Sequence, residues 1–187
     1  MIIPLNDEHW SVEYDGYGEV NIENDLIELQ PKAATSNNET HAALVLSDIK
    51  VRDFYLKITA KTVEQLRENN TPNPWEVFWI FFNYIPAEDN NKDTNYFVLK
   101  QNGYELGRAW EETKQCFLDT GNNPQLILDT EYVYEIKKEG KNVQVWIDGQ
   151  RIINFTDNNN EMTDDYGYIG FYSEDAVVNV SGAEISV

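Results

Sequence analysis

Residues 131–172 decide the fold: EYVYEIKKEGKNVQVWIDGQRIINFTDNNNEMTDDYGYIGFY. Apolar and polar side chains alternate through most of this stretch, which is the period of a strand with one buried face. The Asp148-Gly149 pair favours the positive φ angles of a tight hairpin turn. The pattern therefore predicts consecutive antiparallel strands, as in an all-β sandwich. The expected strands cover Tyr132–Lys137, Val143–Ile147, Arg151–Thr156 and Gly167–Tyr172.

The rest of the chain repeats this rhythm of short apolar segments between polar loops. Only Val63–Asn69 suggests a helix, and the prolines of Thr71–Pro74 suit a loop equally well. No loop is long enough to be a linker, so residues 1–187 are predicted to form a single domain. The further expected strands are Glu19–Glu23, Leu26–Gln30, Ala42–Ser47, Phe54–Ala60, Glu76–Tyr84, Asn95–Gln101, Tyr104–Trp110, Cys116–Leu118, Leu126–Leu128 and Val177–Val187.

Charge narrows the classes of partner. The chain carries 33 acidic and 14 basic residues, for a net charge of −19. Such a surface repels phosphate backbones and anionic lipids, which argues against nucleic-acid and membrane-surface binding. No apolar run is long enough to insert in a bilayer. Cys116 is the only cysteine, so no intrachain disulfide can form.

No signal peptide is recognisable at the N-terminus, because Met1–Pro4 lacks the basic and apolar regions of such a peptide. Such a protein either stays inside the cell or has lost its signal. The acidic composition would suit a salty exterior, so we expect an extracellular or cell-surface location.

Several short motifs occur in a characteristic order. They are Trp10–Gly16 near the start, Leu26–Pro31, Phe54–Thr59, a central strand rich in Trp and Phe, Val145–Gly149, and Gly167–Tyr172 near the end. In this order they resemble the concanavalin A-like lectin/glucanase superfamily. The likeness is to domains similar to family-sixteen glycoside hydrolases and 3-keto-disaccharide hydrolases, and it covers most of the chain.

The resemblance implies a jelly roll of two antiparallel sheets, with a concave outer face that binds sugar in many members. It also implies a structural Ca²⁺, which is common on the convex side. Calcium needs several hard oxygen ligands from carboxylates and carbonyls. Asp15, Glu19 and Asp175, the last next to Glu174, are the candidates because the terminal strands of a jelly roll lie side by side.

The segment from Pro72 to Tyr84 is the best candidate for a sugar-facing strand. Strand alternation places Trp75, Trp79 and Asn83 on one face, where indoles can stack on a sugar ring and an amide can bond its hydroxyls. The alternative is that both faces are buried, because Val77 and Phe81 would share this face and are apolar too.

The next two segments predict a hairpin around Gln101–Gly103. Lys100, Glu105 and Arg108 either form a surface ladder of ion pairs or line a polar cleft with Trp79, Asn83 and Gln115, in which Arg108 could clamp a uronic carboxylate. Glu105 and Arg108 differ in strand parity, so they share a face only if Gly107 forms a bulge.

The sequence lacks the E-x-D-x-x-E motif that supplies the two carboxylates of family-sixteen hydrolases. We therefore predict a non-catalytic module that binds a polysaccharide or other glycan. One alternative is a polysaccharide-active enzyme, lyase or hydrolase, with Glu105, Lys100 and Arg108 as catalytic residues, and another is a structural or adhesion module. The predicted carbohydrate-binding residues are Trp75, Trp79, Asn83, Tyr96, Lys100, Glu105, Arg108 and Gln115.

Overall fold

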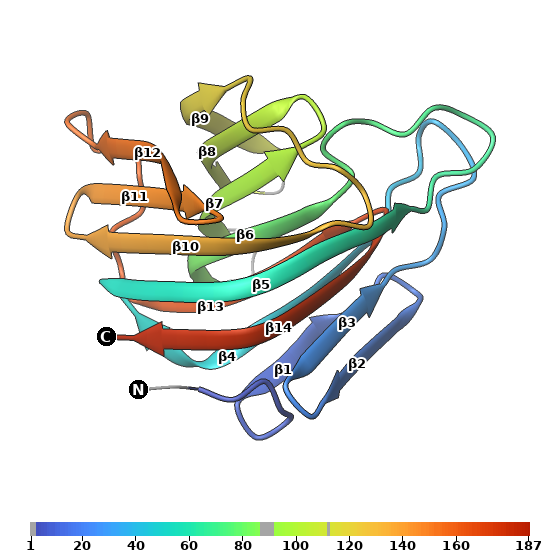
Figure 1. Cartoon of the computed structure of the whole chain (residues 1–187), viewed down its shortest axis with the longest axis horizontal. Helices are drawn as coiled ribbons and strands as arrows, with labels where there is room; N and C mark the ends of the chain where they lie inside the picture. The colour runs from blue at the N-terminus through green and yellow to red at the C-terminus, as the bar shows by residue number, and fades with distance from the viewer. Residues whose placement is uncertain (1–2, 87–91, 112) are drawn as a thin grey trace.

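A computed structural model describes residues 3–86, 92–111 and 113–187 of the chain. It is a sandwich of two antiparallel sheets with seven strands each, which confirms the predicted jelly-roll class (Figure 1). Sheet A has the order β1 (Trp10–Tyr14), β4 (Ala42–Val51), β13 (Gly167–Glu174), β6 (Phe78–Ile85), β7 (Asp93–Lys100), β8 (Gly103–Trp110) and β9 (Lys114–Gly121).

Sheet B lies in front of sheet A in Figure 1, with β10, β5 and β14 crossing the centre of the view. Its order is β12 (Gln150–Thr156), β11 (Asn142–Ile147), β10 (Glu131–Glu139), β5 (Phe54–Gln65), β14 (Ala176–Ser186), β3 (Leu26–Gln30) and β2 (Glu19–Glu23).

The predicted hairpins form, both within residues 131–172 and between β7 and β8. Asp148 and Gly149 have φ angles of 51° and 78°, and they join β11 to β12 in a two-residue turn. Asn102 lies in the turn that joins β7 to β8, and Lys100 pairs with Gly103 across it. Turn chemistry therefore fixed the register of these strands, as the sequence indicated.

Two local expectations were wrong. The Val63–Asn69 segment is not helical, because Val63 to Gln65 complete β5, with Glu64 and Gln65 paired to β14, and residues 66–69 form the alternative loop. Leu126–Leu128 is not a strand, although Leu126 is buried in the core. The described residues include no helix long and apolar enough to cross a membrane.

Aromatic side chains join the two sheets in the core. Phe78 of sheet A meets Tyr134 of sheet B with ring centroids 5.6 Å apart, and Phe54 meets Phe82 at the same distance. These contacts bury the inner faces of both sheets. A binding site must therefore be sought on the outer faces of the sheets.

Candidate functional site

A hollow of about 370 Å³ lies on the outer face of sheet A. Its walls come from five neighbouring strands and their connections, so the sheet itself forms the floor. The lining residues are Trp75, Trp79, Lys100, Asn102, Glu105, Gln115, Phe117 and Glu174. The hollow therefore brings together five of the eight predicted carbohydrate-binding residues.

Two tryptophans occupy different levels of the hollow. Trp79 is 9% exposed and lies on the floor, and its Nε1 donates to the Trp75 carbonyl at 2.8 Å. Its ring packs against Tyr96 and Tyr172, with centroids 5.0 and 6.0 Å away. Trp75 is 43% exposed and presents its ring to solvent. Trp79 thus lies outside the layer between the sheets, and Trp75 is the available stacking surface.

A buried polar chain forms the wall opposite Glu174. Lys100 and Glu105 make an ion pair, and both side chains are mostly buried. Glu105 Oε1 also accepts from the Tyr96 hydroxyl at 3.4 Å, and Gln115 donates to that hydroxyl in turn. Burial lowers the pKa of Lys100 and raises the pKa of Tyr96 to about 12. The chain holds Glu105 and Gln115 at fixed positions beside the hollow.

Glu174 ends β13 and turns its carboxyl group toward the hollow. The Tyr172 hydroxyl donates to Glu174 Oε2 at 2.8 Å. Burial raises the pKa of Glu174 to about 7, and the neighbouring Asp175 and Glu76 add to this shift. This carboxyl group therefore holds its proton to a higher pH than an exposed glutamate does.

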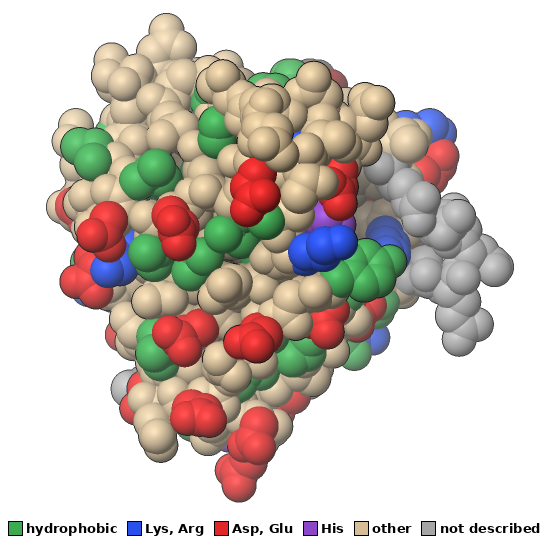
Figure 2. Space-filling view, turned by 90° about the vertical axis from the view of Figure 1, so that its right-hand side faces the viewer, with side chains coloured by type: hydrophobic (Ala, Val, Ile, Leu, Met, Phe, Trp, Pro, Cys, Tyr) green, Lys and Arg blue, Asp and Glu red, His purple; other side chains and the backbone are tan. Residues whose placement is uncertain are grey.

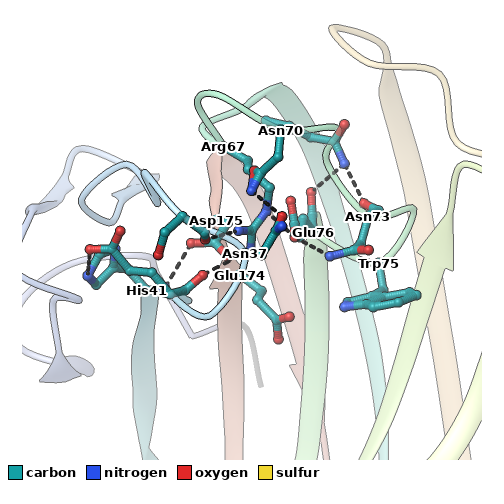
Figure 3. A network of polar contacts seen from close by, with 12 residues as sticks. Asn37, His41, Arg67, Asn70, Asn73, Trp75, Glu76, Glu174 and Asp175 are labelled. Carbon is teal, nitrogen blue, oxygen red and sulfur yellow. Dashed lines mark hydrogen bonds and ion pairs between the residues drawn. The ribbon is translucent and has the colours of Figure 1, made fainter.

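An ion cluster lies directly beneath Glu174, at the end of β5. Arg67 donates through Nε to Glu76 Oε1 at 2.7 Å and through Nη2 to Asp175 Oδ2 at 2.9 Å, and all three side chains are almost completely buried. Figure 3 shows Arg67 between these two carboxylates, while the Glu174 carboxyl group extends away from the cluster. Arg67 also donates to the carbonyls of Ser36 and Glu39. None of these bonds reaches Glu174.

A second, smaller hollow continues along the same face. It is lined by Tyr14, Phe81, Tyr84, Lys92, Thr94, Ala109, Trp110, Glu111, Lys114 and Tyr172. Tyr172 connects the two hollows, because its ring stacks on Phe81 at 4.7 Å and meets the edge of Trp79. The outer face of sheet A therefore carries a continuous row of aromatic rings.

The predicted position of Asn83 was wrong. Asn83 has a φ angle of 52°, and the pairing register shifts between Phe82 and Ile85. This bulge turns Asn83 into the protein, where its amide donates to the carbonyls of Val51, Arg52 and Asp165. The side chain is fully buried and lies outside the hollow. A bulge shifts the alternation by one residue, so counting along the strand failed here.

The position of Arg108 also differs from the predicted cleft. The bulge near Gly107 lies on the partner strand β9, while the register between β7 and β8 is unbroken. Arg108 therefore keeps the parity opposite to Glu105. It donates to both oxygens of Asp93 at 2.9 and 2.7 Å and does not line the hollow. Arg108 is therefore not placed to clamp a uronic carboxylate in the hollow, contrary to the prediction.

Two of the three predicted calcium ligands, Asp15 and Asp175, accept hydrogen bonds within the protein. Asp175 accepts from Arg67 and from the His41 backbone N–H, and Asp15 accepts from the Tyr17 backbone N–H. In the ranges that the structure covers, no group of three or more His, Cys, Asp or Glu side chains is placed to hold a metal. Asp15, Glu19 and Asp175 do not form such a group, and a structural calcium ion stays a prediction.

Sequence reasoning missed Asn102, Phe117 and Glu174 as lining residues. Glu174 had a usable signal: Tyr172 and Glu174 are two residues apart, so they share a face, while Asp175 at the strand end points inward. From the sequence, Glu174 was placed only beside the predicted calcium ligand Asp175. The tertiary structure gives its two members different surroundings.

Solved structures with a similar fold include a carbohydrate binding module and glycoside hydrolases, all at low sequence identity. Carbohydrate binding module CBM66 from Bacillus subtilis is 10% identical, with a TM-score of 0.71 and 96% of each chain covered. A Bacillus licheniformis beta-glucanase is 11% identical, with a TM-score of 0.61, covering 99% of this chain and 96% of the other.

A family-sixteen glycoside hydrolase of the Bacteroides ovatus mixed-linkage glucan PUL, in complex with a G4G4G3G product, is 11% identical, with a TM-score of 0.60, covering 97% of this chain and 96% of the other. At this identity the likeness shows the fold, and it agrees with the superfamily resemblance seen in the sequence. No relative matches among curated proteins. The family described as the 3-keto-alpha-glucoside-1,2-lyase-like domain matches residues 5–185, and the chain belongs to this family.

Proposed function

We propose that this protein binds a glycan in the hollow over sheet A. The observation that carries the proposal is the exposed Trp75 ring beside a set of fixed polar groups in one open hollow. A sugar ring has apolar faces that stack on an indole and hydroxyls that pair with amides and carboxyl groups. Asn102, Gln115 and Glu105 supply such groups around the two tryptophans.

The row of aromatic rings supports a ligand longer than one sugar. The second hollow begins at Tyr172, next to Glu174 of the first. A polysaccharide lying across the sheet would place successive rings over Trp75 and over the cluster of Phe81 and Tyr172. The fold shared with a carbohydrate binding module and with glucanases also supports this assignment. An extracellular or cell-surface location is part of the proposal, because polysaccharides are found there.

Binding to a panel of polysaccharides tests this proposal. The panel contains the neutral laminarin, mixed-linkage β-glucan, starch and arabinoxylan, and the acidic polygalacturonate and alginate. Isothermal titration calorimetry should detect binding of at least one of them by the wild type. Trp75→Ala should weaken that binding about fivefold, because stacking contributes on the order of 1 kcal/mol.

Trp146→Ala is the matched control, since Trp146 is a half-buried tryptophan on β11 in sheet B. It should bind as the wild type does. Failure of the whole panel to bind, or equal losses in the two variants, would overturn the proposal and favour a structural or adhesion role.

A second candidate is catalysis on the bound glycan. The hollow holds two carboxyl groups, Glu105 in an ion pair and Glu174 with a pKa of about 7, which suits transfer of a proton near neutral pH. Lys100 lies beside them, whereas Arg108 does not. Incubation with each polysaccharide, followed by measurement of new reducing ends and unsaturated sugars, distinguishes the two. Turnover lost in Glu174→Gln or Glu105→Gln, with binding retained, would establish an enzyme.

A further inference from the structure

We infer that the hollow selects neutral glycans and that Glu174 binds them in its protonated form, so that binding takes up a proton. This inference rests on the proposed glycan binding and names the class of glycan. It follows from the charges that surround Glu174, from the partners of the cations near the hollow, and from the position of Glu174 on the hollow wall.

The ion cluster beneath Glu174 has more negative than positive groups. Glu76 and Asp175 share the single guanidinium of Arg67, whose remaining bonds go to backbone carbonyls. Glu76 Oε2 is buried and has no hydrogen-bond partner among the described residues. An ionised Glu174 would be a third carboxylate beside one cation. The cluster therefore favours the neutral form of Glu174.

The other groups around Glu174 offset this excess only in part, because burial raises the pKa of Glu174 more than the Tyr172 hydrogen bond and the Arg67 charge lower it. Tyr172 on β13 donates a hydrogen bond to it, and Tyr14 on β1 is a second phenol on the same side. Across the hollow, Lys100 is paired with Glu105. His41, near Asp175, contacts Glu39 at 3.3 Å. Among the described residues that line the first hollow, Lys100 is the only cation, and its pair with Glu105 leaves it unavailable to Glu174 or to the carboxylate of an acidic sugar. In the second hollow, Lys114 pairs with Glu111, and Lys92 lies over the Tyr14 ring with Nζ 5.6 Å from its centroid.

A glycan in the hollow would add to this effect. It would exclude water from Glu174, and removal of water further disfavours the charged carboxylate. The protonated group can donate a hydrogen bond to a sugar oxygen. Affinity should therefore be highest when Glu174 is protonated and should fall as the pH rises past 7. A uronate would bring another negative charge to this excess, so acidic polysaccharides should be rejected.

Calorimetry with the panel above tests the inference. We expect the neutral polysaccharides to include the ligand, and polygalacturonate and alginate not to bind. For the tightest-binding neutral polysaccharide, affinity should fall about tenfold between pH 6 and pH 8.5, which corresponds to a shift of about one pKa unit on binding. Titrations at pH 7 in two buffers with different ionisation enthalpies should show net proton uptake.

Glu174→Gln should remove both the pH dependence and the proton uptake, because the amide stays neutral. Glu184→Gln on the exposed face of sheet B should retain both. Tight binding of a uronate polymer, affinity of the wild type independent of pH, or a pH dependence that persists in Glu174→Gln would overturn the inference. If no polysaccharide binds at any pH, the proposed function itself fails, so the two failures can be told apart.

Discussion

The outer faces of the two sheets are built differently, although each sheet has seven strands. On sheet B, the side chains of β10 and β11 alternate between buried and partly exposed, and most outward positions carry charged or polar groups, with Val133 and Trp146 as the exceptions. On sheet A, β6 and β7 are buried on almost every residue, so their outward faces are apolar as well. The outward side chains include Trp79, Phe81, Tyr84, Tyr96 and Tyr172.

The aromatic side chains on the outer face of sheet A lie outside the core between the sheets, so core packing does not explain why they are there. The solvated face of sheet B needs no partner. The aromatic face of sheet A is hollowed, and Glu105 and Glu174 are held there by the buried Lys100 pair and by the Tyr172 hydroxyl. Figure 2 shows Asp and Glu side chains spread over the side of the molecule on the right of Figure 1, with few Lys or Arg. A neutral, ring-shaped ligand suits these features.

The largest expected effect is the loss of stability when the buried ion cluster is broken, compared with the loss when a surface ion pair is broken. Arg67→Ala should lower the free energy of unfolding by about 3–5 kcal/mol, because it leaves the buried carboxylates of Glu76 and Asp175 without their cation. Lys61→Ala, which removes the exposed pair with Asp129 on sheet B, should leave the urea midpoint almost unchanged. Similar losses in the two variants would contradict this contrast.

The next effect concerns the bulge that ends the aromatic face. Asn83→Ala should cost about 2–3 kcal/mol, because three backbone carbonyls lose their donor and alanine disfavours a positive φ angle. Asn83→Gly should lose less, since glycine accepts this φ angle. Chemical denaturation measures both, and calorimetry with the panel should show unchanged glycan affinity. A loss of glycan affinity in either variant while it remains folded would contradict this expectation and indicate that Asn83 contributes to binding.

The smallest effect is the dependence of stability on the charge of Glu174. Its pKa rises from 4.5 to about 7 on folding, so the folded state is favoured below pH 4.5 and loses this advantage as the pH rises through 7. Glu174→Gln should therefore stabilise the protein by about 1–3 kcal/mol at pH 8.5, compared with its effect at pH 4. Denaturation at both pH values measures this difference, and a gain of the same size at both would contradict it.

Much of the fold was predictable because local chemistry agreed with tertiary packing. The Asp148-Gly149 turn set the register of β11 and β12, and alternation identified the strands around it. Alternation also placed Trp79 correctly on the face opposite Phe78. It failed at Asn83, where the register shifts, and at Val63, where a strand extends further than its pattern suggested. Bulges and strand ends depend on partner strands, which a single segment does not reveal.

The sequence by itself determined the sandwich class, the family resemblance, the strong negative charge and the presence of a strand with aromatic residues on both faces. Tertiary structure alone decided which carboxyl groups meet. Glu105 on β8 and Glu174 on β13 are 69 residues apart in the sequence, yet both line one hollow. Their different states arise from neighbours supplied by other strands: Lys100 pairs with Glu105, while Arg67 is held by Glu76 and Asp175. The physical reason is that a carboxyl group responds to the charges and water around it in space, and the order of residues along one strand does not specify either.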